Sequence, residues 1–399
     1  MLRAACYCTI AMVMGSVHQG AYAQAPAVFI ARPGQVIELI DLNGDGDFLD
    51  FAESRVFADS LPTDLNRITA NAGNLFIGAQ TSAEVFVARD LNADGDALDF
   101  GEVTLYGRLP SQTPAPQLAG LGSAPNAGLF AADATAGRLY ALIDANNDGD
   151  ALDFAETLPV AEGLSAPTAV TVRPDGVVLL SQADVNIPVR ILQDRNADGD
   201  FLDFAENISY VESAPVVDDL FAATNPLAFA VRTATGQVAA LRDGNGDNDA
   251  LDIGEVLTYA AGLDTPLVVA SAGKGSDSLL VAAGDAAGTV YLVQDVNGDG
   301  DALDFAEVVV VGMGVNQPTG IVTVAAAMPG CLKGDVNMDA LVDVNDIAPL
   351  VQILAGTTPP ADPCPADVSG DGAINGEDVQ AFIDVLFGTA PLTTRREPR

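Results

Sequence analysis

Residues 295–307 read DVNGDGDALDFAE, and five other stretches of the chain repeat this thirteen-residue pattern. The other copies begin at Asp41, Asp90, Asp144, Asp194 and Asp243. Successive copies start 49, 54, 50, 49 and 52 residues apart. All six carry Asp at motif positions 1, 5, 7 and 10, Asn at position 3, Leu at position 9 and Glu at position 13. We call these copies the acidic loops, number them one to six along the chain, and refer to their residues by motif position.

Each acidic loop holds five carboxylates and at least one amide side chain within thirteen residues. Like charges this close repel one another, and a hard cation that accepts six to eight oxygen ligands removes that repulsion. Ca²⁺ is the usual ion for such a set, so we predict a calcium site in every loop with ligands from positions 1, 3, 5, 10 and 13. The predicted ligands are Asp41, Asn43, Asp45, Asp50, Glu53, Asp90, Asn92, Asp94, Asp99, Glu102, Asp144, Asn146, Asp148, Asp153, Glu156, Asp194, Asn196, Asp198, Asp203, Glu206, Asp243, Asn245, Asp247, Asp252, Glu255, Asp295, Asn297, Asp299, Asp304 and Glu307.

The first half of each acidic loop resembles an EF-hand loop, with Asp, Asn and Asp at positions 1, 3 and 5 followed by a glycine at position 6. In loop five Asn248 replaces that glycine, and Asn tolerates positive φ better than most residues. Glu stands at position 13 instead of 12 and no helices flank the loop, so we predict an EF-hand-like calcium hairpin. The Asp at position 7 could ligate through its side chain or only its carbonyl. Leu at position 9 and Phe or Ile at position 11 are predicted to pin the loop onto the sheet.

A repeat of about 50 residues, with β-rich segments such as GTVYLVQ and VVVVG around each loop, predicts a propeller with four short strands per blade. Residues 28–58 supply only three strands, and the missing innermost strand is predicted at residues 318–324. The expected fold class is therefore mainly β. Residues 24–328 would form a six-bladed β-propeller closed by strands from both ends, which leaves no open sheet edge at the junction. The acidic loops would join the third and fourth strands of each blade, on one face and toward the rim.

The chain opens with a short apolar run after Arg3 and then reaches Ala21-Tyr22-Ala23, which predicts a secretory signal peptide over residues 1–23. The run is too short to span a bilayer, and no later stretch is apolar enough for a transmembrane segment. We therefore expect export by a bacterial Sec signal to the extracellular space or the cell surface. The only histidine, His18, would leave with the signal peptide.

From residue 329 onward the pattern changes to two copies of a twelve-residue acidic loop, each followed by apolar residues at helical spacing. A duplicated loop with Asp at its twelfth position and one exit helix resembles a type I dockerin, over roughly residues 331–388. The resemblance implies a small α-helical, calcium-binding, dockerin-like domain at residues 329–388 that docks to a cohesin-like protein or a cell-surface scaffold. The calcium ligands it implies are Asp335, Asn337, Asp339, Asp343, Asp346, Asp367, Ser369, Asp371, Asn375 and Asp378.

Two features depart from the dockerin pattern. Ala340 stands where a glycine is expected, which puts the first site in doubt, and Cys331 and Cys364 are an addition. Two cysteines that remain in an oxidising compartment most simply pair, so we predict a disulfide between the two halves. Residues 389–399 are a basic tail that we expect to be a solvated, disordered end, with contact to an acidic envelope or a sorting role left open.

The formal net charge is −38, and the acidic loops hold thirty of the 55 acidic residues, five in each of six loops. This field makes nucleic acid a poor partner. General acidity, for solubility or a salt-rich habitat, does not explain one spacing fixed six times. A turn without a metal would need one or two Asp, Asn or Gly residues, not six oxygen-bearing side chains.

A mature chain without histidine excludes Ser–His–Asp and Cys–His catalysis and a His-ligated zinc. Our main hypothesis is a secreted, non-catalytic, monomeric, calcium-stabilised propeller that displays a binding or structural surface and is anchored through its dockerin-like domain. One alternative is a lactonase-like or glycosidase-like propeller hydrolase with its site over the central channel, because carboxylates are plentiful. Another is calcium buffering or mineral contact by the acidic rim.

Overall fold

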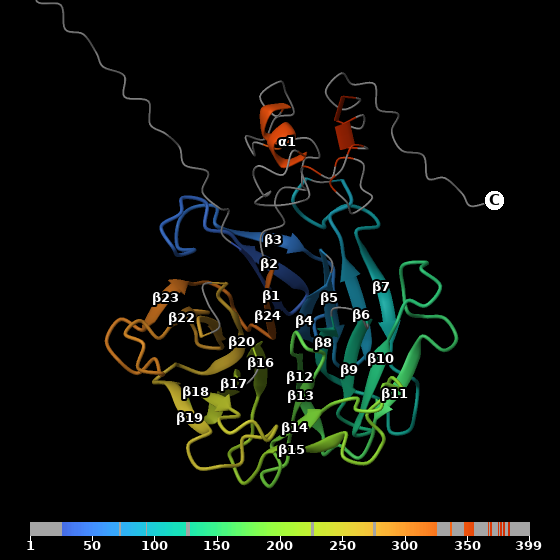
Figure 1. The fold of residues 1–399 in the computed structure, drawn as a ribbon, viewed down its shortest axis with the longest axis vertical. Helices are drawn as coiled ribbons and strands as arrows, with labels where there is room; N and C mark the ends of the chain where they lie inside the picture. Colours follow the sequence, from blue (N-terminus) through green and yellow to red (C-terminus); the bar gives the residue numbers. More distant parts are fainter. Residues whose placement is uncertain are drawn as a thin grey trace, which may run out of the picture. The chain divides into compact units, whose positions relative to one another are not determined.

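Figure 1 shows the computed structural model of the chain. The structure describes residues 26–324 except 72, 93, 125–127, 225–226 and 274–276, and in the C-terminal part residues 336, 347–354, 366, 368, 374, 376, 378–379 and 382–383. The chain divides into two compact units, one of them Ala25–Ala327 and the other including Met328–Arg399. The predicted signal peptide, the predicted Cys331–Cys364 pair and the basic tail lie outside the described residues.

Six four-stranded antiparallel sheets follow one another around a centre and form the blades of a propeller (Figure 1). Blade 1 consists of β24 (Gly320–Val324), β1 (Ala27–Arg32), β2 (Gln35–Leu39) and β3 (Ser54–Ala58). Blade 2 consists of β4 (Leu65–Asn71), β5 (Asn74–Ala79), β6 (Glu84–Ala88) and β7 (Val103–Arg108), and blade 3 of β8 (Leu118–Ala124), β9 (Gly128–Asp133), β10 (Arg138–Leu142) and β11 (Thr157–Ala161).

The other three blades repeat the same order from the inner to the outer strand. Blade 4 consists of β12 (Pro167–Val172), β13 (Val178–Gln182), β14 (Val189–Leu192) and β15 (Asn207–Val211). Blade 5 consists of β16 (Asp219–Thr224), β17 (Leu227–Arg232), β18 (Gln237–Arg242) and β19 (Val256–Ala261), and blade 6 of β20 (Pro266–Ser271), β21 (Leu279–Ala283), β22 (Val290–Val293) and β23 (Val308–Gly312). A short 3₁₀ turn, η1 (Thr233–Thr235), joins β17 to β18. The predicted six-bladed, mainly β fold is confirmed.

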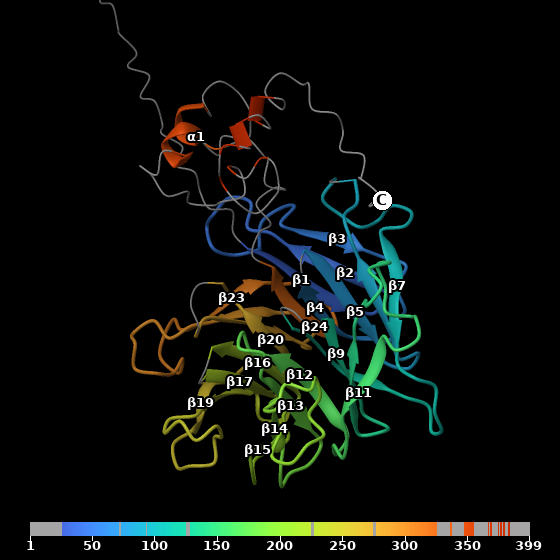
Figure 2. The same ribbon diagram turned by 45° about the vertical axis from the view of Figure 1, so that its right-hand side comes forward.

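The ring closes because its last strand pairs with its first. Strand β24 is antiparallel to β1, with Ile321 opposite Ile30, so the innermost strand of blade 1 comes from the far end of the propeller sequence. Figure 2 shows β24 beside β1 from a second direction. A blade built from both ends hydrogen-bonds the two termini of the propeller together and removes an open edge at the junction. The predicted closure is confirmed.

The core lies between the blades. Six clusters of buried apolar side chains each combine residues from two neighbouring blades, for example Ile30 and Ile37 of blade 1 with Leu280 and Val311 of blade 6. The strands are short and rich in Val, Ile, Leu and Ala, and many are buried on both faces. Each blade therefore depends on both neighbours for the burial that stabilises it.

Near the axis the inner strands come so close that glycine is required. A Cβ on Gly320 would lie 2.7 Å from the backbone nitrogen of Ile68, and one on Gly120 would lie 2.8 Å from the Val170 side chain and 3.0 Å from the backbone of Ala169. Contacts this short involve backbone atoms that cannot move without shifting a neighbouring blade. Glycine at these places therefore sets the narrow bore of the ring.

The C-terminal unit contains the helix α1 (Ile347–Leu354), which follows the first dockerin-like loop as predicted. Among the described residues of this unit, Leu350 and Phe382 are buried together with Val336, Ala366 and Val368. None of the helices in the described part of the chain is long and apolar enough to cross a membrane.

Candidate metal centres

The acidic loops join the third and fourth strands of all six blades, as predicted, so they leave every sheet at the same end. In Figure 1 the connections from β18 to β19 and from β22 to β23 project from the periphery of the ring. Position 6 has a positive φ in every loop, between 74° at Asn248 and 101° at Gly149 and Gly300. The expectation that Asn248 serves in place of glycine is confirmed.

The carboxylate at position 1 organises the first half of each loop. One of its oxygens accepts a hydrogen bond from the backbone N–H of position 6 in all six loops, at 2.8–3.0 Å. In four of the five loops whose position 4 is described, its other oxygen accepts the N–H of that position, as Asp41 does from Gly44 at 2.6 Å. Backbone donors thus hold the turn around the carboxylate, which a run of Asp, Asn and Gly favours.

The Asn at position 3 lies between two carboxylates. Its Nδ2 donates to the position-5 Asp at 2.9–3.1 Å and to the position-10 Asp at 2.5–2.8 Å in every loop. Its Oδ1 accepts the N–H of position 5. Residues that are seven apart in sequence therefore meet, and the structure brings predicted ligands 3, 5 and 10 together.

The glutamate at position 13 is the buried floor of the loop, with 1–6% of the residue exposed in all six copies. Its Oε1 accepts the N–H of position 2 in every loop, at 2.8–3.1 Å. Its Oε2 accepts the N–H of position 10 in five loops. A buried carboxylate that accepts two backbone N–H groups is held in one orientation.

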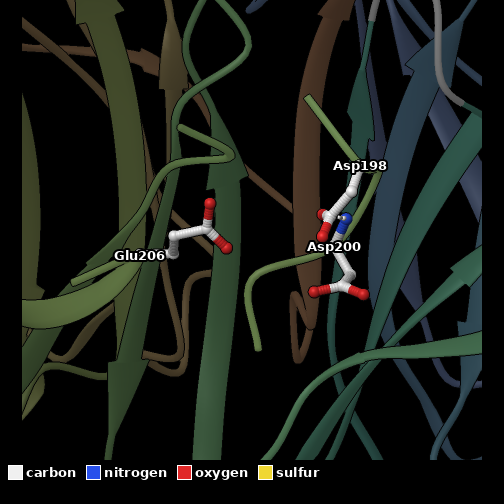
Figure 3. Close-up of side chains that lie close together, drawn as sticks. All are labelled: Asp198, Asp200 and Glu206. Carbon is white, nitrogen blue, oxygen red and sulfur yellow. Dashed lines mark hydrogen bonds between the residues drawn. The ribbon is translucent and has the colours of Figure 1, made fainter. Parts of the chain in front are cut away.

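Loop four is the exception, because Oε2 of Glu206 is buried without a hydrogen-bond partner. Asp198, Asp200 and Glu206 each offer a carboxylate oxygen within 4.8 Å of the others. Figure 3 shows Glu206 on one side of this space and the two aspartates on the other. A buried carboxylate oxygen without a hydrogen-bond partner destabilises the fold unless a cation or a water molecule contacts it. This cluster of three carboxylates therefore fits a hard cation.

The position-7 aspartate uses one oxygen to cap the turn, since its Oδ1 accepts the N–H of position 9 in every loop, at 2.8–3.0 Å. In loop five, partial burial raises the pKa of Asp249, and the neighbouring carboxylates of Asp247, Asp252 and Glu255 add to the rise. In loop four, Asp200 at this position belongs to the acidic cluster. The second carboxylate oxygen of the position-7 aspartate is therefore a candidate metal ligand, in addition to the side chains at the five predicted positions.

The way the loops attach to the ring differs from the sequence prediction. Position 11 is fully exposed, at 99–107% in all six loops, and the position-9 leucines are about half exposed, at 45–51%. The prediction that these two positions pin the loop onto the sheet is wrong, because a loop that turns back at position 12 carries them outward. Position 12 has a positive φ in all six loops, and four of those residues are alanines.

Position 8 makes the attachment instead. Its backbone N–H donates to the outer strand of the preceding blade in every loop, as from Ala151 to the carbonyl oxygen of Tyr106 at 2.6 Å. Its side chain is buried in five loops, from 1% exposed at Ala151 to 6% at Phe201, and half-buried at Phe48. Little in the repeat pattern indicated this role, because position 8 is Phe in two loops and Ala in four and looks like a variable site.

The second dockerin-like loop ends at Asp378, which is fully buried at the start of a helical segment. The other nine implied dockerin ligands, Asp335, Asn337, Asp339, Asp343, Asp346, Asp367, Ser369, Asp371 and Asn375, lie outside the described residues.

The central channel contains two charged residues that the sequence analysis did not single out. A cavity of about 170 Å³ is lined by all six inner strands, and Arg67 and Asp219 lie at the same level on blades 2 and 5, which face each other across the ring. The Arg67 guanidinium donates to the carbonyl oxygens of Thr168 at 2.7 Å, Asp218 at 3.1 Å and Thr319 at 3.2 Å. Arg67 therefore ties blades 1, 2, 4 and 5 together across one level of the channel.

Asp219 is 8% exposed, and its Oδ2 accepts the N–H of Val269 in blade 6 at 2.9 Å. Burial raises the pKa of Asp219, and the positive charge of Arg67 opposes that rise. A single Arg and an Asp-Asp pair near the start of two inner strands were the sequence signs of these two residues.

Comparison with known proteins gives a domain family for the C-terminal part of the chain and only a fold likeness for the propeller. The dockerin type I domain matches residues 333–386, so the chain carries a dockerin domain where the sequence predicted one. Dockerin domains bind calcium and cohesins and occur in extracellular cell-surface assemblies. No curated protein matches the chain.

The propeller has structural relatives of low sequence identity. A chain of a nidogen–laminin complex superposes with a TM-score of 0.53 at 14% identity, covering 75% of this chain and 98% of that one. A putative 6-phosphogluconolactonase from Bacteroides fragilis gives 0.48 at 14% identity, with 76% and 99% coverage. A streptogramin B lyase gives 0.43 at 13% identity, with 76% and 88% coverage. The first likeness supports the propeller fold and says nothing of activity.

The revised attachment of the loops makes a first prediction. Ala151→Leu forces a larger side chain against Gly107 and the neighbouring blade and should lower the free energy of unfolding by about 1–3 kcal/mol. Phe154→Ser, three residues away in the same loop, should change it by less than about 0.5 kcal/mol because Phe154 is fully exposed. Chemical denaturation followed by circular dichroism measures both. A larger loss for Phe154→Ser would restore position 11 as the attachment point.

Proposed function

We propose that this protein is a secreted, non-catalytic, calcium-binding propeller that presents a surface and is held in an extracellular assembly by its dockerin domain. The observation that carries the calcium part is the same in six places. Each acidic loop gathers positions 3, 5 and 10 by one set of hydrogen bonds above a buried glutamate, and every side chain in the set offers hard oxygen.

The fit between loop and ion rests on charge as well as on donor type. The backbone N–H groups of a loop orient its five carboxylates but do not cancel their charge, and Glu206 keeps one buried oxygen unpaired. A divalent cation in each loop would replace the Asn bridge between two carboxylates by direct ligation. The ligand set we propose is positions 1, 3, 5, 10 and 13, with position 7 as a further candidate.

Calcium dependence is the second prediction. Each loaded site should add about 2.7 kcal/mol at a free calcium concentration of roughly 100 times its Kd, so chelation should lower the Tm by roughly 10 °C or more. Differential scanning calorimetry with EDTA, with calcium restored, and with magnesium at the same concentration measures this. Titration calorimetry should return about eight ordered sites, six in the propeller and two in the dockerin domain. An unchanged Tm would end the calcium proposal, and many weak sites would favour calcium buffering instead.

The dockerin domain supplies the proposed attachment to a cohesin-type partner. The two halves of the domain expose apolar residues at matching positions thirty-two residues apart, Ile347 with Val379 and Val351 with Ile383. Exposed side chains that repeat in both halves are available to a partner, whereas Leu350 and Phe382, which also match, are buried in the core. The partner we propose carries a complementary apolar surface of the cohesin type.

The third prediction tests this attachment. In the full-length protein, Val351→Asp combined with Ile383→Asp should weaken binding to a responsive cohesin module by roughly 100-fold or more, because both charges would be buried at the interface. Biolayer interferometry against a set of purified cohesin modules, in calcium, measures the loss. Phe154→Asp, which adds the same charge at an exposed apolar site of the propeller, is the control and should bind normally. If the wild type, the double variant and the Phe154→Asp control bind cohesin equally well, the proposed docking surface is wrong.

A second candidate, a propeller hydrolase, is favoured by one observation. Asp219 is a buried carboxyl of raised pKa beside the cavity of the central channel, and such groups often mark active sites. Against it, Arg67 is fixed to backbone oxygens of the surrounding blades, and the hydroxyls of Thr69 and Thr323 are hydrogen-bonded to neighbouring blades. These hydrogen bonds join neighbouring blades, which favours a structural role for the channel residues over catalysis.

The fourth prediction separates the two candidates. We expect no hydrolysis of chromogenic lactones or glycosides above buffer, either by the wild-type protein or by Asp219→Asn. Turnover by the wild type that Asp219→Asn abolishes, and that Asp133→Asn retains, would establish the hydrolase instead. Asp133 is a suitable control because it is also buried and lies outside the channel lining, where it accepts hydrogen bonds from the backbone of Gln117 and Thr135.

A further inference from the structure

The backbone of each acidic loop is hydrogen-bonded to the blade that precedes its own around the ring. In loops two to six the attachment joins segments about 40 to 50 residues apart, such as Ala97 to Phe57. Loop one differs, because the N–H of Phe48 donates to the carbonyl oxygen of Val311 in β23 at 2.6 Å. This hydrogen bond joins the first blade to the last, and so it joins the two ends of the propeller sequence.

Besides the apolar cluster shared by blades 1 and 6, few backbone hydrogen bonds hold this seam. The first three strands, β1 to β3, are held to the end of the propeller by the five-pair ladder between β1 and β24 and by the N–H of Thr319, which donates to the carbonyl oxygen of Ala31 at 2.9 Å. A covalent connection continues from the outer strand of each blade to the inner strand of the next, including from β23 of blade 6 to β24 of blade 1. Only in blade 1 does the integrity of the sheet depend on a noncovalent pairing between its inner strand and the rest.

The packing around loop one reinforces the same seam. Phe48 packs against the apolar cluster shared by blades 1 and 6, whereas loops two, three, five and six carry alanine at this position. A small cavity of about 40 Å³ lies beside it, lined by Pro26 and Leu292 among others. The same cavity is lined by Asp41, the first residue of the loop, and by Gly46. The proposed metal loop and the closing contact of the ring are therefore one continuous structure.

We propose that acidic loop one, residues 41–53, is a calcium-operated clasp of the ring. With the ion bound, the loop is ordered and holds β23 through Phe48. With the ion lost, mutual repulsion of Asp41, Asp45 and Asp50 loosens the loop, and β1–β3 detach from β24 and blade 6 as a unit while the other blades stay folded. This inference rests on the proposed calcium binding by the loops, and it adds that one of six similar sites controls ring opening.

A matched pair of variants tests the proposal in the full-length protein. Glu53 and Glu102 occupy position 13 of loops one and two, are 1% and 2% exposed, and accept the same two backbone hydrogen bonds at 2.9–3.0 Å. Glu53→Gln and Glu102→Gln therefore remove the same charge from equivalent sites. Hydrogen–deuterium exchange with mass spectrometry, at a calcium concentration that just saturates the wild type, reports which strands open.

The expected result is asymmetric. In Glu53→Gln, the amides of β1, β2 and β24 should exchange roughly tenfold faster or more, while blades 3 to 5 keep wild-type protection. In Glu102→Gln, faster exchange should stay within loop two and the adjoining ends of β6 and β7. A disulfide across the closing ladder, from Ala27→Cys with Val324→Cys, joins directly opposed residues and should restore protection to the Glu53→Gln protein.

Three outcomes decide the matter. Equal and local effects of the two variants would overturn the clasp while leaving calcium binding intact. Faster exchange across all blades in Glu53→Gln, without rescue by the disulfide, would also overturn it, since the loop would then support the whole fold. If wild-type exchange in the six loops does not respond to calcium or to chelator, the proposed calcium function itself fails.

Discussion

The structure depends on how six short loops hold thirty carboxylates without being driven apart. Within each loop, backbone N–H groups donate hydrogen bonds to the carboxylates at positions 1, 7 and 13. The Asn at position 3 bridges two more carboxylates. Hydrogen bonds orient these groups but leave their net charge, and a divalent cation is the economical way to neutralise what remains.

The same loops matter to the ring because separate sheets in a propeller share few backbone hydrogen bonds. Hydrogen bonds join neighbouring blades at two distances from the axis of the ring. Near the axis, side chains do this work, as Thr168 does toward Val217 and Asp219 toward Val269. At the rim, the N–H of position 8 reaches the preceding outer strand in all six loops. Between these two rings of polar contacts lie the apolar clusters that account for most of the burial.

The two units carry different kinds of information about function. The dockerin domain has a family and, through it, a class of partner. The propeller resembles a chain of a nidogen–laminin complex in fold at 14% identity, which shows the fold alone, so its role is argued from its own residues. Those residues commit most of the acidic groups to metal-type loops and fix Arg67 of the channel in place, which supports a display or structural role.

Repeat spacing and donor type are properties of local stretches, so they were enough to predict the number of blades, the strand that closes the ring and the oxygen-rich side chains of the loops. The same local pattern identified Asn248 as a residue for positive φ. No local pattern showed that position 8, and not positions 9 and 11, faces the neighbouring blade, or that Arg67 and Asp219 line one channel. These contacts join residues far apart in the chain, and their partners are set by the curvature of the closed ring, which no local pattern encodes.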